Sequence, residues 1–359
     1  MASSIRGLTL TPVLTASALY VLTRGPPSLQ QPLLTKLLTY ISPRTLSRLI
    51  TGLKVLLGAS LLKTLNLSLS AWAGNNFTLF SSTKGWDWPN EIAVVTGGSS
   101  GFGALFTADL TAKGIKVVVL DINPLPAHLA SNPLVTFHQC DVTSRVAVLE
   151  VGDKIRAELG DATILINNAG MGAGKSILGT DDAFLARIFG VNLFSHYYTV
   201  QAFLPAMLKH KKGHIVNIAS IASFVAPATI IDYAATKAGA LVFHEGLRSE
   251  LRTLHHCPEI KTSIIHPSWA DTPLIAPGKA HLQKAGEKIL DPQDVSDAVV
   301  AQILNGRSGQ IVLAGSGVKA TLISGLRGMP GWWQEMIGRL TEDKSHKVTE
   351  KGVDSWKTA

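Results

Sequence analysis

Tyr233 and Lys237 are the two side chains of this chain whose types and spacing could transfer a proton. They stand four positions apart in a segment with helical spacing, so both side chains share one helix face. A free tyrosine has a pKa near ~10, and a neighbouring ammonium group stabilises the phenolate and lowers that pKa. The pair could therefore act as an acid–base at neutral pH. Because Tyr-x-x-x-Lys also occurs by chance in many helices, this prediction depends on its surroundings.

Ser220 is the candidate partner of this pair. It directly follows the apolar run 214–219, which reads as a buried strand. Ligands of open parallel sheets collect at the carboxyl ends of the strands. We therefore expect Ser220 to donate a hydrogen bond to a substrate oxygen and to hold that oxygen beside Tyr233.

A glycine-rich turn lies between the strand-like run 91–95 and the helical segment 104–110. Glycines in such a turn allow positive φ and let the backbone approach a pyrophosphate at the positive end of the helix dipole. The alternative is that the glycines serve only the conformation of a loop. The residues expected to bind a dinucleotide here are Gly97, Ser99, Ser100, Gly101, Phe102 and Gly103.

Asp121 ends the next apolar run, 116–120, near the offset at which an acidic residue meets the adenosine ribose. Its carboxylate would accept hydrogen bonds from a free diol and repel a 2′-phosphate, and the glycine turn offers no Arg or Lys to neutralise one. NAD is therefore favoured as cofactor, and NADP is not excluded. The alternative is that Asp121 only ends a turn before Asn123 and Pro124.

Two further apolar runs end in polar or small residues. The run 134–140 ends at Asp141 and Val142, where a carboxylate and a backbone amide could hold the adenine edge. The run 162–166 is followed by an element whose small residues suit a backbone that passes close to a ligand. The cofactor-contacting residues expected in that element are Asn168, Ala169 and Gly170.

Taken together, these motifs resemble the classical short-chain dehydrogenase/reductase family over residues 89–317. Thr-Gly-x-x-x-Gly-x-Gly is complete at 96–103, Asn-Asn-Ala-Gly at 167–170 and Tyr-x-x-x-Lys at 233–237. The resemblance implies an α/β fold with a Rossmann-type doubly wound parallel sheet flanked by helices. It also implies hydride transfer between a substrate carbon and a nicotinamide, with proton transfer by Tyr233 and a nicotinamide-ribose contact from Lys237.

The resemblance adds a fourth catalytic residue, Asn192, which in the family positions a water that relays protons to the lysine. It also adds Pro267 and Thr272 as cofactor contacts, with Thr272 at the nicotinamide carboxamide. The chain departs from the family here, because Ser268 replaces the glycine that usually follows the proline. Trp269 is expected either near the substrate entrance or in the core.

Residues 1–88 form a leader distinct from the catalytic domain in composition. Eight Lys or Arg and one acidic residue, Asp87, give residues 1–90 a net charge of +7, out of +8 for the whole chain. Since residues 91–359 are nearly balanced, nucleic-acid binding is a poor explanation of the basic charge. Residues 318–359 form a tail in which Trp332, Trp333, Met336, Ile337 and Leu340 predict an amphipathic helix, followed by a polar, mobile end.

The leader predicts a basic amphipathic helix in a membrane interface. Leucines and isoleucine from Leu46 to Leu61 recur at helical spacing, while Arg44, Arg48 and Lys54 gather on another side. Prolines 26, 27 and 32 are expected to separate this helix from the apolar segment 7–22. A cleaved transit peptide and a helix docked on the catalytic domain are the alternatives. The expected location is the endoplasmic reticulum or a lipid-droplet surface, or alternatively the mitochondrion.

The resemblance to membrane-associated members of the family implies a lipophilic substrate, a retinoid, steroid or lipid-like alcohol or ketone. The alternatives are an NADPH-dependent ketoreductase of a biosynthetic pathway and a non-catalytic cofactor-binding protein. No metal site is expected, since the histidines show no ligand spacing and two cysteines, Cys140 and Cys257, imply neither a zinc site nor a disulfide framework. Family members commonly pair helices, so a homo-oligomer is also expected.

Overall fold

The computed structural model describes residues 12–78, 83–315 and 317–339. The chain divides into two compact units, Met1–Leu79 and Phe80–Ala359, and each is described by itself. Residue 340 and the end predicted to be mobile lie outside the described residues, as does the start of the apolar segment 7–22.

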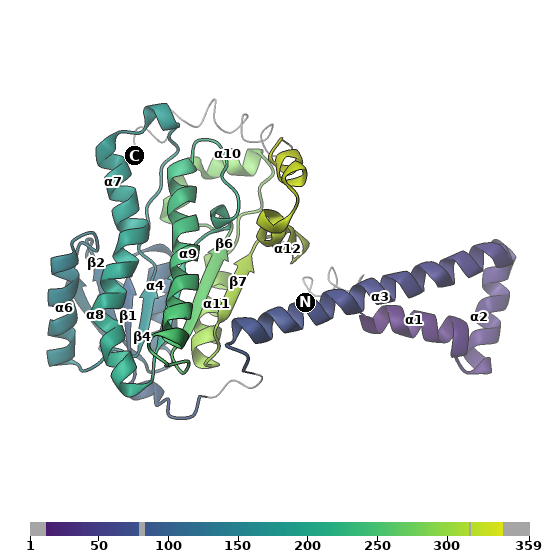
Figure 1. Cartoon of the computed structure of the whole chain (residues 1–359), viewed down its shortest axis with the longest axis horizontal. Coiled ribbons are helices and arrows are strands. Elements are labelled where there is room, and N and C mark those ends of the chain that lie inside the picture. Colours follow the sequence, from purple (N-terminus) through teal and green to yellow (C-terminus); the bar gives the residue numbers. More distant parts are fainter. Residues whose placement is uncertain (1–11, 79–82, 316, 340–359) are drawn as a thin grey trace. The chain divides into compact units, whose positions relative to one another are not determined.

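The second unit is built on one seven-stranded parallel sheet (Figure 1). Its spatial order is β3-β2-β1-β4-β5-β6-β7, so the order reverses between β1 and β4 and creates a switch point at their carboxyl ends. This confirms the predicted doubly wound fold. The strands are β1 Ile92–Thr96, β2 Lys116–Asp121, β3 Val135–Gln139, β4 Ile164–Asn167, β5 His214–Ile218, β6 Lys261–Pro267 and β7 Gly309–Leu313.

Helices cover both faces of the sheet (Figure 1). The α-helices are α4 Gly101–Thr111, α5 Ala127–Ala130, α6 Arg145–Glu158, α7 Asp182–Phe189, α8 Ser195–His210, α9 Ile231–Thr253, α10 Lys279–Lys284, α11 Pro292–Leu304 and α12 Gly317–Gly325. A π-helix, η4 (Gly190–Phe194), joins α7 to α8. The 3₁₀ turns are η2 Trp88–Asn90, η3 Ile177–Gly179, η5 Ile221–Ser223, η6 Pro273–Gly278 and η7 Leu326–Gly328, and residues 331–339 are helical.

Alternate residues of the strands feed two separate hydrophobic cores. Val94 and Leu165 face a core shared with α6, α8 and α9. Their neighbours Val95 and Ile166 face the core shared with α4 and α11. Because both faces are covered, β1 and β4 are continuous apolar runs rather than alternating ones. This is why these strands were predictable from the sequence.

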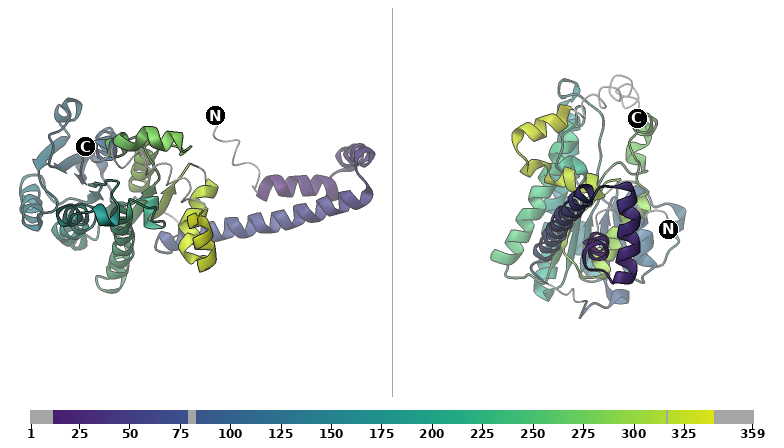
Figure 2. Two further views of the ribbon diagram at one scale, coloured as in Figure 1. Left: turned by 90° about the horizontal axis from the view of Figure 1, so that it is seen from above. Right: turned by 90° about the vertical axis from the view of Figure 1, so that its right-hand side faces the viewer.

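The first unit consists of three helices: α1 (Pro12–Arg24), α2 (Pro27–Tyr40) and α3 (Pro43–Gly74). α1 and α3 lie side by side, and α2 connects them (Figures 1 and 2). Ser42 caps α3, since its hydroxyl accepts a hydrogen bond from the Thr45 amide at 3.2 Å. By length and composition α3 could cross a membrane, and only 11% of its most apolar window is buried.

One expectation for the leader was wrong in detail. Pro32 does not stand in a break between two helices but lies inside α2. Pro27 occupies the first turn of α2, where a missing amide hydrogen removes no hydrogen bond. α2 has no buried residue, so the carbonyl that Pro32 leaves unbonded is not trapped in a core. The breaks fall instead before Pro27 and Pro43.

Candidate active site

The glycine turn after β1 leaves no space for side chains at two positions. Gly97 has a φ of +65°, and a Cβ there would lie 2.9 Å from the Cα of Ala169. A Cβ on Gly103 would lie 2.1 Å from the carbonyl oxygen of Gly97. The turn therefore presents bare backbone at the amino end of α4, where the helix dipole favours an anion. This cradle fits the pyrophosphate of a dinucleotide.

Asn168 fastens the turn after β4 to the glycine turn. Its side-chain nitrogen donates to the carbonyl oxygens of Thr96 and Gly97, both at 3.0 Å. In return, the Thr96 hydroxyl accepts from the backbone amides of Asn168 and Ala169, again at 3.0 Å. The two turns on either side of the switch point thus form one hydrogen-bonded unit. Thr96 begins the Thr-Gly-x-x-x-Gly-x-Gly motif, but its role in joining the two turns was not predicted from the sequence.

Asp121 lies at the end of β2 with both carboxylate oxygens engaged. One oxygen accepts from the amide of Ser99 and the other from the amide of Asn123, each at 2.9 Å. The carboxylate is therefore next to the glycine turn, as a ribose-binding residue must be. It also orders the turn after β2, which is the alternative role considered above. The two roles are compatible because each carboxylate oxygen has a second lone pair.

Lys237 is buried beneath Tyr233 on α9. Its Nζ lies 5.7 Å from the centre of the Tyr233 ring and donates to the carbonyl oxygen of Ile218 at 2.9 Å. Burial lowers the pKa of Lys237 to about 8, because a charged ammonium loses its hydration there. Helical spacing has thus placed the two side chains together, as predicted.

The pKa of Tyr233 differs from the expectation. Burial raises the pKa of its phenol, and a hydrogen bond with the Ser220 side chain opposes that rise. The Lys237 Nζ faces the ring and also donates to the carbonyl oxygen of Ile218. The hydrogen bond with Ser220 favours the phenolate, but burial outweighs it.

Asn192 lies on the π-helix η4 and is fully buried. Its side-chain oxygen accepts from the Met171 amide, and its nitrogen donates to the Met171 carbonyl, both at 2.8 Å. The nitrogen also donates to the Thr236 hydroxyl at 3.1 Å. Asn192 therefore joins the loop after β4 to α9. Its partner on α9, Thr236, directly precedes Lys237.

The remaining predicted residues fall into a central and a peripheral group. A Cβ on Gly170 would lie 3.7 Å from both the Asn192 side-chain oxygen and Lys237 Nζ, so the Asn-Asn-Ala-Gly turn reaches the proton-transfer residues. A Cβ on Gly101 would lie 3.6 Å from Thr272, which brings the segment after β6 to the glycine turn. Ser100 is exposed, Phe102 packs on the α4 core, and Pro267 ends β6.

Asp141 and Val142 lie farther along the same edge, after β3. Asp141 is exposed, and one of its oxygens accepts from both the amide and the hydroxyl of Thr143. Gly172 is a close neighbour that the sequence did not single out, since a Cβ there would lie 3.2 Å from the Tyr233 ring. The run of alternating glycines after Asn168 was the available signal.

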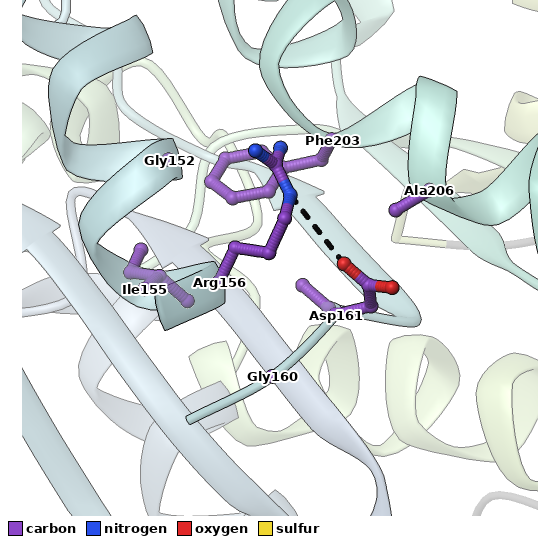
Figure 3. A pocket seen from close by; sticks show the side chains of 8 residues that line it. Gly152, Ile155, Arg156, Gly160, Asp161, Phe203 and Ala206 are labelled. Carbon is purple, nitrogen blue, oxygen red and sulfur yellow. Dashed lines mark ion pairs between the residues drawn. The ribbon is translucent and has the colours of Figure 1, made fainter. Parts of the chain in front are cut away.

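A small depression on another part of the unit is not the site. Seven of its lining residues, from α6, α8 and the loop before β4, are labelled in Figure 3, which shows the Arg156 and Asp161 side chains paired across it. The two side chains approach to 3.4 Å. The depression adjoins the amino end of β4, whereas the candidate residues gather at the carboxyl ends of the strands. Its empty volume is only about 180 Å³.

Comparisons with known proteins place the chain in a family of oxidoreductases. A family model described as short chain dehydrogenase matches residues 91–282, and the chain belongs to this family. Dehydrogenase RED2 of Cochliobolus heterostrophus is 39% identical over 202 residues, which cover 55% of this chain and 75% of the relative.

Two animal relatives carry substrate names. Estradiol 17-beta-dehydrogenase 11 of Macaca fascicularis is 32% identical over 60% of this chain and 71% of its own length. Retinol dehydrogenase 10-B of Danio rerio is 34% identical over 51% of this chain and 62% of its own length. The chain is thus an oxidoreductase-family member with retinol and steroid dehydrogenases among its relatives.

Two similar solved structures contain a nicotinamide cofactor. A short chain dehydrogenase/reductase from Burkholderia phymatum in complex with NAD aligns with a TM-score of 0.60 and 25% identity, over 68% of this chain and 95% of that chain. A metagenomic short-chain oxidoreductase in complex with NADP aligns with a TM-score of 0.51 and 27% identity, over 63% of this chain and 96% of that chain. These likenesses support nicotinamide cofactor use without separating NAD from NADP.

Proposed function

We propose that this chain interconverts a lipophilic alcohol and its carbonyl compound with a nicotinamide cofactor. The observation that carries the proposal is the meeting of three elements at one point. The Ser220 side chain opposes the rise in the pKa of Tyr233, and Lys237 lies beneath the tyrosine ring. The Asn-Asn-Ala-Gly turn, which is hydrogen-bonded to the glycine turn, reaches Lys237 at Gly170. The cofactor, when bound, supplies or accepts the hydride.

Each residue then has a defined task. Ser220 donates to the substrate oxygen and holds it beside Tyr233. In the direction of oxidation, the Tyr233 oxygen takes the hydroxyl proton of the substrate, and in reduction it returns that proton to the carbonyl oxygen. Lys237 stabilises the negative charge on the tyrosine oxygen when the proton has left. Asn192 holds the loop after β4 against α9, and so fixes the position of the Asn-Asn-Ala-Gly turn relative to Tyr233.

We propose NAD as the preferred cofactor. The carboxylate of Asp121 lies within hydrogen-bond distance of the glycine turn and would repel a 2′-phosphate bound there. The described part of the turn, 97–103, contains no cation to offset that repulsion. The opposite preference would point to an NADPH-dependent reductase of a biosynthetic ketone.

A lipophilic substrate and a membrane location are supported by two features. The retinol and estradiol dehydrogenases among the relatives are named for apolar substrates. The leader exposes large apolar side chains along α1 and α3, among them Val13, Tyr20, Val55 and Leu62. No acidic residue occurs before Asp87. An apolar, cationic hairpin of this kind is suited to a lipid surface with anionic headgroups.

Detergent-solubilised protein tests the proposal directly. Reduced-cofactor absorbance is followed with NAD or NADP and a panel of retinoid, steroid and aliphatic alcohols. We expect turnover with NAD and an apolar alcohol, and a loss of about 10²- to 10⁴-fold in Tyr233→Phe, the range for general acid–base catalysis. Tyr197→Phe, an exposed tyrosine on α8, is the matched control and should retain activity. Turnover that survives in Tyr233→Phe would contradict the assignment.

A further inference from the structure

The backbone pairing of β5 with β6 stops just before Ser220. The last hydrogen bond of the ladder runs from the Ala219 amide to the Ile265 carbonyl, at 2.8 Å. In a parallel ladder with this register, the next donor toward β5 would be the amide of residue 267. That residue is Pro267, which has no N–H. That amide would have donated to the Ala219 carbonyl, so the backbone pairing of β6 with β5 ends one residue before the candidate catalytic serine.

The side chain of His266 supplies a donor at this point. Its ring is fully buried, and Nδ1 lies 2.9 Å from the carbonyl oxygen of Ser220. A carbonyl oxygen only accepts, so Nδ1 must carry the hydrogen. The other ring nitrogen, Nε2, is buried with no hydrogen-bond partner among the residues the structure describes. An unprotonated Nε2 is favoured there, because an unpaired buried N–H is the rarer and costlier arrangement.

The surroundings keep this ring neutral and in place. The Phe224 ring lies 4.6 Å from it, centre to centre, and is itself buried. Burial lowers the pKa of His266 to about 4, and the hydrogen bond to Ser220 opposes this only in part. The ring therefore stays neutral under the conditions of an ordinary assay.

Ser220 is consequently held through both its carbonyl and its hydroxyl by adjacent residues of β6. Its hydroxyl lies 3.4 Å from the Pro267 carbonyl oxygen and accepts from the Ala222 amide at 3.2 Å. Ser220 is extended, with a φ of −166°, at the start of η5. If the carbonyl bond to His266 were lost, the Ser220 peptide could rotate and carry its hydroxyl away from Tyr233.

We propose that His266 is a positioning residue for Ser220: its Nδ1–H fixes the Ser220 peptide, and thereby aims the serine hydroxyl at Tyr233 and the substrate oxygen. The proposal rests on the proposed function of the site. The alternative is that His266 only fills the core beside Phe224.

Three substitutions separate the two roles. His266→Asn keeps an N–H donor close to the position of Nδ1. His266→Gln moves the donor toward the position of Nε2, and His266→Leu keeps an apolar side chain of similar size and no donor. All three remove the ring from Phe224, so a pure packing role predicts similar losses in all of them.

We expect kcat to fall about 10- to 100-fold in His266→Leu and His266→Gln, the range expected when one hydrogen bond to a catalytic group is lost. His266→Asn should recover most of that loss. The Kd for NAD should stay within about twofold in every variant, since the glycine turn is untouched. A kcat in His266→Leu equal to wild type would overturn the proposal, as would equal losses in the Asn and Leu variants at equal melting temperatures.

A second measurement does not require turnover. In the ¹⁵N spectrum of labelled protein, the imidazole signals that vanish in His266→Asn belong to His266. We expect them to show a neutral ring protonated on Nδ1 at pH 7, and an Nε2-protonated or charged ring would overturn the proposal. If wild-type protein oxidises no alcohol of the panel, the proposed function fails, while the tautomer still decides whether His266 holds Ser220.

Discussion

The Cα of Gly103 lies against the carbonyl oxygen of Gly97, and a Cβ on Gly103 would come within 2.1 Å of that oxygen. The obstructing atom belongs to the backbone, and the backbone here is also held by the Asn168 side chain. A rotamer change cannot relieve such a contact. The first turn of α4 and the end of β1 can therefore approach each other this closely only with glycine at position 103.

Gly103→Ala should abolish cofactor binding. The added methyl group forces the first turn of α4 away from Gly97 and so opens the cradle for the pyrophosphate. We expect the Kd for NADH, measured by its own fluorescence, to rise more than about 100-fold, the equivalent of roughly 2.7 kcal/mol. Gly246→Ala on α9, where a Cβ meets nothing within 4 Å, is the control. It should bind NAD normally and be more stable by up to about 1 kcal/mol.

Lys237 should make the stability of the protein depend on pH in a defined window. Its folded pKa is about 8, below the ordinary value of 10.5, so between these pH values the unfolded chain holds a proton that the native state has released. The free energy of unfolding then rises with pH, by at most ~1.4 kcal/mol per pH unit, and the penalty is fully present below pH 8.

Lys237→Met removes both the free-energy penalty of burying the ammonium group and the proposed catalytic role of the lysine. We expect the variant to be inactive and about 1–3 kcal/mol more stable than wild type at pH 7, with the difference shrinking above pH 8. Urea unfolding at pH 7, 8, 9 and 10 measures both effects. Wild-type and variant stabilities that run parallel over this range would contradict the prediction.

Asp121→Asn should weaken the discrimination against NADP. The substitution removes the negative charge that would face a 2′-phosphate and keeps a side chain of the same shape. We expect the ratio of the NADP Kd to the NAD Kd to fall about tenfold or more, since ~1.4 kcal/mol of repulsion corresponds to a factor of ten. Asp153→Asn, an exposed position on α6, should leave the ratio unchanged. A ratio that is the same in both variants would show that Asp121 serves only the turn.

Asn192→Asp tests the junction between the loop after β4 and α9. The aspartate keeps the acceptor for the Met171 amide, but it loses the donors to Met171 and Thr236 and turns an oxygen toward the Met171 carbonyl. Because Asn192 is fully buried, we expect a destabilisation of about 2–4 kcal/mol, read as a lower melting temperature, together with lost turnover. Asn305→Asp, which loses one exposed bond to Ala301, should change stability by about 0.5 kcal/mol or less.

The parts of the fold that could be predicted from the sequence are those marked by a pattern of neighbouring residues, such as an apolar run that ends in a polar residue. The runs ending at Asp121, Asn167 and Ser220 are continuous because both faces of the sheet are covered, and each polar residue appears where its strand ends. β7, Gly309–Leu313, was not predicted, because its residues are only partly buried and its pattern is weak.

The tertiary features of the site could not be read from neighbouring residues. The pKa of Tyr233 depends on burial and on Ser220, thirteen positions away, which no local spacing reports. The bond between His266 and Ser220 likewise depends on the register of β5 with β6. Asn192 was identified only by resemblance, because a buried asparagine in a helix has no signature until the loop that it binds is in place.

The π-helix η4 sets the angular phase between the two helices that it joins. A π-turn contains one residue more than an α-turn, so removing a single residue from Gly190–Phe194 would restore an uninterrupted α-helix. Everything after the deletion would then rotate by about 100° relative to everything before it. Asn192 could meet Met171, or Thr199 could reach Asn167 from α8, but not both. The extra residue therefore lets the continuous helical segment from α7 to α8 bond the active-site loop through Asn192 and the sheet through Thr199.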